Sequence, residues 1–66
     1  MDRKNETSNM IKLLLEIGVS REFIASKLGS SISAVRLWEK GERNPSYGTF
    51  KLLKQIYKYN KGKEIK

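Results

Sequence analysis

The side chains that could do chemistry in this 66-residue sequence are mostly cations. Fourteen Lys and Arg stand against seven Asp and Glu, with no Cys and no His, and the formal net charge is +7. Without Cys or His the sequence lacks disulfides, thiol chemistry, the commonest zinc ligands and the usual general base near neutral pH. No close Asp/Glu pair offers acid–base catalysis. We therefore expect no enzyme, no cofactor and no metal, but binding to a polyanion, either nucleic acid or an anionic membrane surface.

Residues 20–39 have the spacing of two short helices joined by a tight turn. Ala25 lies four residues before Gly29, and Val35 lies six residues after it. Where two helices cross steeply, a small residue lets the backbones approach, Gly relieves the turn and an apolar residue fills the crossing. Trp38 is at helical spacing from Val35, which favours packing in the core over stacking on a base. The pattern predicts a helix-turn-helix.

Four helices, or five if a short terminal turn forms, are predicted to hold this segment in an all-α fold. A Ser or Thr cap and a Gly stop bound the first three: Thr7 or Ser8 to Gly18, Ser20 to Gly29, and Ser30 or Ser31 to Gly41. The last helix follows Pro45, begins at Ser46 or Tyr47 and ends near Tyr59. Apolar residues recur at helical spacing in the first and last helices: Met10, Leu13, Leu14 and Ile17, then Phe50, Leu53 and Tyr57.

These elements predict one domain with two polar ends. Residues 1–6 are expected to be flexible, 7–59 to form the helix-turn-helix domain, and 60–66 to be a flexible Lys-rich tail. The Lys-rich end is either a solvated face or a nonspecific phosphate arm. No apolar run approaches the roughly 18 residues of a membrane span, so a cytoplasmic protein is expected.

From Met10 to Tyr57 the chain resembles the lambda-repressor/Cro family, also called XRE-type helix-turn-helix regulators, which are compact all-α domains. The residues that match the family pattern occur in order and without insertion: Gly18-Val19-Ser20, Ile24-Ala25, Lys27-Leu28-Gly29, Ser31, Val35, Trp38-Glu39, Gly41, Arg43 and Pro45-Ser46. The segment from Trp38 to Ser46, added to the helix-turn-helix spacing, makes a chance match improbable.

The resemblance implies that the third helix lies in the major groove of double-stranded DNA. Position by position, the residues facing base edges are Ile32, Ser33, Arg36 and Leu37. Ser33 can exchange hydrogen bonds with base edges, Arg36 can pair with guanine or contact a phosphate, and apolar side chains can pack on thymine methyls. Phosphate contacts are implied for six residues at helix starts and around the reading helix: Ser20, Arg21, Ser31, Lys40, Arg43 and Ser46.

Two departures from the family pattern change the expectations. Where many members have an Arg on the first helix that pairs with the Glu after Trp, this chain has Leu14. We therefore expect Glu39 to pair with Arg43 or Arg36 instead. Many members also end in a fifth helix that makes the dimer contact, whereas this sequence continues into a Lys-rich end.

A dimer or partner surface is predicted from apolar residues outside the core stripes. Its members are Phe23, Leu52, Ile56 and Tyr59. The three on the last helix either wrap onto the first helix or form an exposed patch that makes a homodimer. The sequence's tyrosines are expected to pack rather than to stack on nucleotides.

The favoured function is a DNA-binding transcription regulator, a repressor of bacterial, phage, plasmid or mobile-element type that occupies an operator without chemistry. The alternative keeps the fold but makes the protein a small co-regulator or antirepressor that binds another transcription protein through its apolar surface. A loss of DNA affinity on charge reversal at Arg21 and Arg36 favours the first. A loss of activity on polar substitution at Ile32 and Leu37 favours the second. A membrane-surface role for the Lys-rich helix is a weaker alternative.

Overall fold

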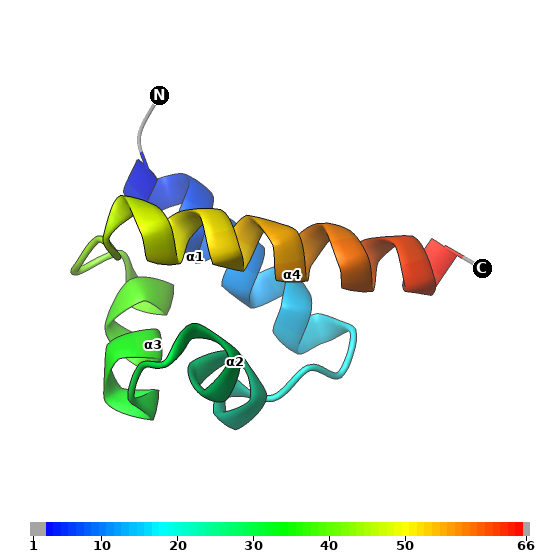
Figure 1. Cartoon of the computed structure of the whole chain (residues 1–66), viewed down its shortest axis with the longest axis horizontal. Coiled ribbons are helices and arrows are strands. Elements are labelled where there is room, and N and C mark those ends of the chain that lie inside the picture. Colours follow the sequence, from blue (N-terminus) through cyan, green and yellow to red (C-terminus); the bar gives the residue numbers. More distant parts are fainter. Residues whose placement is uncertain (1–2, 66) are drawn as a thin grey trace.

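The computed structural model describes residues 3–65, with the side chains of residues 5–60, and the described chain forms four helices without strands. They are α1 (Arg3–Glu16), α2 (Arg21–Leu28), α3 (Ile32–Lys40) and α4 (Tyr47–Ile65). Figure 1 shows α4 along the length of the molecule, with α1 behind it and α2 and α3 below. Both α1 and α2 pack against α3 and α4, which confirms the predicted all-α, four-helix fold.

Serine hydroxyls begin three of the helices, as the sequence predicts. Each accepts a hydrogen bond from the backbone N–H three residues later: Ser20 from Phe23 at 3.0 Å, Ser31 from Ala34 at 3.1 Å and Ser46 from Thr49 at 3.3 Å. Gly29 and Gly41 end α2 and α3 with φ of 66° and 78°, a left-handed conformation that side chains with a Cβ rarely adopt. The turn between α2 and α3 is therefore fixed on both sides by local chemistry.

One apolar core joins the four helices. Its centre includes Ala25 and Val35, which lie at the predicted crossing of α2 and α3, and Trp38, which is buried as predicted. The buried members are Met10, Ile11, Leu14, Ile24, Ala25, Leu28, Val35, Trp38, Phe50 and Leu53. Because every helix contributes to this cluster, the position of α3 depends on all the others.

The first helix differs from the sequence prediction in its start and its buried face. It begins at Arg3 rather than after a cap at Thr7 or Ser8, and both of those residues are buried within it. Leu13, expected in the core stripe, is 43% exposed, and Ile11 is fully buried instead. The predicted cap is wrong because Thr7 and Ser8 lie inside α1 with their side chains buried, and not at the start of the helix.

The last helix is longer than predicted. It continues to Ile65 instead of ending near Tyr59, so the backbone of residues 60–65 is helical. The expected inner stripe is confirmed, since Phe50 and Leu53 are buried and Tyr57 packs against the core. No helix among residues 3–65 is both long and apolar enough to cross a membrane.

Candidate nucleic-acid interface

The outer face of α3 presents most of the residues predicted to read bases. Ile32, Ser33 and Arg36 are exposed on the helix, while Leu37 is half-buried. Val35 and Trp38 on the opposite side anchor α3 in the core, so the helix has one buried face and one face open to a partner. The structure thus brings Ile32, Ser33 and Arg36 to one surface, with Leu37 at its edge.

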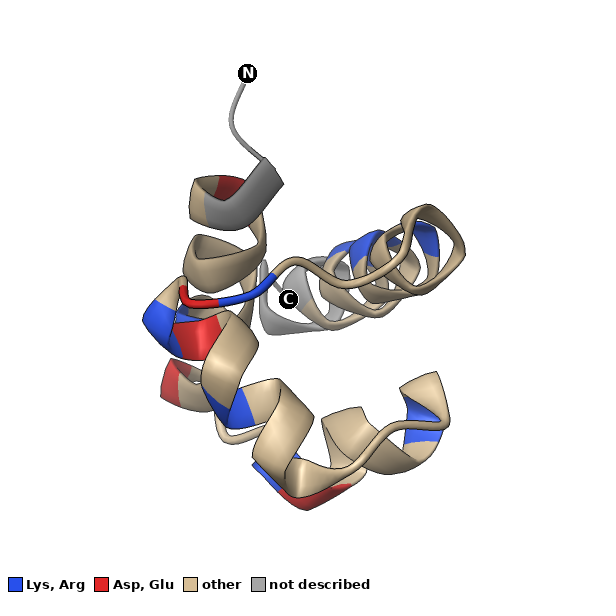
Figure 2. Cartoon of the chain, turned by 90° about the vertical axis from the view of Figure 1, so that its left-hand side faces the viewer, with Lys and Arg blue, Asp and Glu red and all other residues tan. Residues whose placement is uncertain are grey.

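Cations from α2 and α3 meet in a shallow hollow beside this face. The hollow measures about 290 Å³ and is lined by Arg21, Arg36, Glu39 and Lys40. Figure 2 shows Lys and Arg positions in α3, in the connector that follows it and along α4. Three cations around a single carboxylate leave the hollow with excess positive charge, which suits phosphate oxygens.

Arg21 and Glu39 form a two-pronged ion pair that ties the start of α2 to the end of α3. Arg21 Nε donates to Glu39 Oε1 at 2.8 Å, and Nη2 donates to Oε2 at 3.0 Å. These hydrogen bonds lower the pKa of the Glu39 carboxyl, burial opposes them, and the positive charges of Lys12 and Arg36 add to the lowering. The same pair raises the pKa of the Arg21 guanidinium.

This pair corrects the predicted partner of Glu39. With Leu14 in place of the family's usual arginine, the sequence predicts Arg36 or Arg43 as the partner. The crossing of α2 and α3 instead places Arg21, 18 residues earlier in sequence, against the carboxylate. Arg21 is consequently not a free cation, although Nη1 takes no part in the two bonds to Glu39.

Ser8, which the sequence predicts as a cap of the first helix, instead holds the end of α3 in place. Its hydroxyl donates to the backbone carbonyl of Glu39 at 2.6 Å. The last carbonyls of a helix have no partner within it. Ser8 supplies one from α1, while the N–H groups of Gly41 and Glu42 bond to Trp38 and Leu37. The end of the reading helix is therefore held by α1 and by its own connector.

The remaining predicted phosphate contacts lie at the rim of α3 and at helix starts. Lys40 and Arg43 are exposed, at the end of α3 and in the connector to α4. The hydroxyls of Ser20, Ser31 and Ser46 are engaged as helix caps, and Ser46 also donates to Thr49 Oγ1 at 3.0 Å. Arg43 does not line the hollow formed by Arg21, Arg36 and Lys40.

The predicted dimer or partner surface is largely exposed. Phe23 is 43%, Leu52 45% and Tyr59 66% exposed, whereas Ile56 is partly buried against the core. Among the tyrosines, Tyr57 packs against the core as expected. Tyr47 is 64% exposed, contrary to the expected packing, and the exposure of Tyr59 fits the exposed-patch alternative predicted for it. Tyr47 and Tyr59 lie on α4 outside its inner stripe, and neither belongs to the core cluster or to the side chains packed against it.

Comparison with known proteins gives one match, to a family model. A family model described as helix-turn-helix, HTH_3, matches residues 10–61. Neither curated proteins nor solved structures yield a match. The matched region contains α2, the turn, α3 and the connector that carry the cations described above.

Proposed function

Because the chain belongs to the helix-turn-helix family of the lambda-repressor/Cro (XRE) type, whose members are DNA-binding regulators of transcription, we propose that it is a sequence-specific repressor. It occupies an operator with α3 in the major groove of double-stranded DNA. The observation that carries the proposal is the exposed face of α3 beside a hollow lined by three cations. Repression then requires only that the bound protein block access to the promoter.

Base reading is assigned to the exposed side chains of α3. Arg36 offers paired N–H donors for guanine, Ser33 a hydroxyl for a neighbouring base edge, and Ile32 an apolar surface for a thymine methyl. Leu37 is half-buried and contributes contact at the edge of this face. One arginine and one serine give few directional contacts, so the shape of the site adds to the selection.

Phosphate binding is assigned to the cations and helix starts around α3. Lys40 and Arg43 contribute exposed charge on one side of the reading face, and Arg21 contributes Nη1 while Glu39 orients its plane. The starts of α2, α3 and α4, capped by Ser20, Ser31 and Ser46, offer further backbone N–H donors. These contacts set register and affinity without reading sequence.

Selection of bound duplexes from a randomised DNA pool tests the proposal. The purified chain is used at about 150 mM salt, where nonspecific phosphate binding is weak. We expect one enriched motif. A palindromic motif indicates two copies with half-sites about 34 Å apart, and a single half-site indicates one copy. Binding without enrichment that vanishes at this salt contradicts the proposal.

Two exposed arginines provide a matched comparison. Arg36→Ala should change or lose preference at one base pair, at a cost of about 1–3 kcal/mol for the original site. Arg43→Ala should keep the motif, weaken all duplexes alike and reduce the slope of log affinity against log salt by about 0.9. An unchanged motif with Arg36→Ala, or an altered one with Arg43→Ala, contradicts the assignment of roles.

A further inference from the structure

An apolar groove lies between α2 and α4, away from the cation hollow. It measures about 400 Å³ and is lined by Phe23, Lys27, Gln55, Ile56, Tyr59 and Asn60, which together we call the α2–α4 groove. Phe23 and Tyr59 expose large parts of their rings, and Ile56 reaches from the groove into the core. It shares no lining residue with the hollow formed by Arg21, Arg36, Glu39 and Lys40. A ligand in the α2–α4 groove would therefore not contact the residues of the cation hollow.

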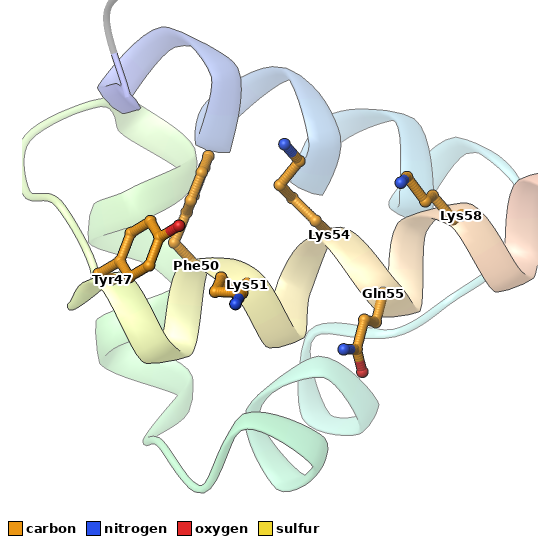
Figure 3. Close-up of a pocket in the computed structure, with 6 residues that line it drawn as sticks. All are labelled: Tyr47, Phe50, Lys51, Lys54, Gln55 and Lys58. Carbon is orange, nitrogen blue, oxygen red and sulfur yellow. The ribbon is translucent and has the colours of Figure 1, made fainter.

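Lysines lie on both sides of the α2–α4 groove. On the α2 side, the Lys27 ammonium lies over the Phe23 ring at 5.5 Å from its centroid. On the α4 side, Gln55 also lines a second hollow of about 310 Å³, which carries Lys51, Lys54 and Lys58. In Figure 3, Lys54 and Lys58 extend to the α1 side of α4 while Gln55 extends to the α2 side. Among the side chains of residues 5–60, which the structure describes, no carboxylate lines either the groove or this second hollow.

We propose that the α2–α4 groove docks an amphipathic helix of another protein whose apolar stripe is flanked by carboxylates. The stripe inserts one large side chain between Phe23 and Tyr59, and the flanking carboxylates meet Lys27 on one side and Lys51 on the other. Aromatic side chains in such a groove are typical binding hot spots.

Charge decides between this partner and a second copy of the chain. The protein carries a net charge of +7, and Lys27 and Lys51 flank the groove, whereas Lys54 in the neighbouring hollow has its Nζ 4.0 Å from a carboxylate oxygen of Glu6. A second copy would bring the same lysines toward this face and be repelled. An acidic helix neutralises them and gains from the same field.

The test selects peptides from a displayed library of randomised helical sequences against the full-length chain. We expect acidic, amphipathic sequences to be enriched, and synthetic versions with Lys in place of each Glu or Asp to lose binding. Tyr59→Ser and Lys27→Glu should each weaken binding by about tenfold. Leu13→Ser is the control, because Leu13 is an exposed apolar side chain on α1 that lines neither the groove nor the second hollow, and it should leave affinity unchanged. All three substituted residues are exposed, and circular dichroism checks that the variants fold.

Four results of these measurements, and a fifth from a heparin probe, would overturn the proposal. The four are the absence of enrichment, enrichment of basic or neutral peptides, selected peptides that bind Tyr59→Ser as tightly as the original chain, and a dimer in sedimentation that Tyr59→Ser dissociates. The last result would place a second copy in the groove. Heparin serves as a charge-only probe: if Tyr59→Ser weakens peptide binding but not heparin binding, the contact depends on the groove and the proposal is supported. Equal weakening of both would contradict it.

Discussion

Replacing Thr7 by Val should stabilise this protein. Thr7 is fully buried in α1, and its Oγ1 has no hydrogen-bond partner among the residues that the structure describes. The hydroxyl has therefore lost its contact with water on folding without gaining another. Valine has nearly the same shape and a methyl group in place of the hydroxyl, so the substitution removes the unpaired group without opening a cavity.

The expected gain follows from the cost of an unpaired buried hydroxyl. Such a group costs about 1–3 kcal/mol, while Thr and Val have similar helix propensities. We expect a gain at the lower end of this range, about 1 kcal/mol. For a domain of this size, that gain raises the melting temperature by about 4–8 °C.

Thermal and urea unfolding followed by circular dichroism at 222 nm measures the change. Ser8→Ala is the matched control at the adjacent buried hydroxyl. It breaks the bond to the Glu39 carbonyl and should cost about 1 kcal/mol. A Thr7→Val variant that melts below the original chain would refute the reasoning, because it would mean that the hydroxyl has a partner in solution.

Three further substitutions test the fold and the ion pair. Ala25→Leu overfills the α2–α3 crossing and should cost about 1–3 kcal/mol in urea unfolding; unchanged stability would contradict the placement of the crossing. Gly41→Ala puts a Cβ at φ of 78° and should lower stability by about 1–2 kcal/mol, seen as a lower melting temperature. Folding lowers the pKa of Glu39, so its ion pair with Arg21 stabilises the folded state at pH values above the unfolded pKa of about 4.3. This stabilisation is lost as the pH falls through the lower pKa that Glu39 has in the folded state. Glu39→Gln should remove this acid-dependent loss, measured by urea midpoints across pH, and an unchanged pH profile would refute the role of the pair.

Local signals explain why most of the fold could be predicted from sequence. Ser20, Ser31 and Ser46 cap their helices through bonds within three residues, and Gly29 and Gly41 end helices through their own backbone conformation. These interactions depend on neighbours in the chain, so the chain order reveals them. The crossing at Ala25 and Val35 was also predictable, because steric fit fixes its spacing.

The interactions that escaped prediction join residues distant in sequence. Ser8 and Arg21 both reach Glu39, from 31 and 18 residues away. A signal for the ion pair was present: Leu14 leaves Glu39 without its usual cation, and the start of the second helix, beside the third, carries Arg21. Thr7 and Ser8 resembled a cap because hydroxyls suit both helix starts and buried carbonyls, and sequence does not distinguish the two. The predicted end of α4 is too early because residues 60–66 are mostly polar and Lys-rich, which is typical of a flexible tail. The helix continues to Ile65 because residues 60–65 contain no Pro, and Gly62 weakens a helix by only about 1 kcal/mol without breaking it.

Because α3 has one buried face and one exposed face, the residues of its exposed face can be substituted without changing its packing. Val35 and Trp38 hold the helix in the core, and Ser8 fixes the carbonyl of its penultimate residue, whereas Ile32, Ser33 and Arg36 are exposed. Changes at these three positions alter what the helix presents without disturbing how it is held. Under the proposed function, new operator preferences can arise by substitutions at a few surface positions, while the scaffold keeps its stability. The same scaffold is then a starting point for grafting other reading faces onto a chain of 66 residues.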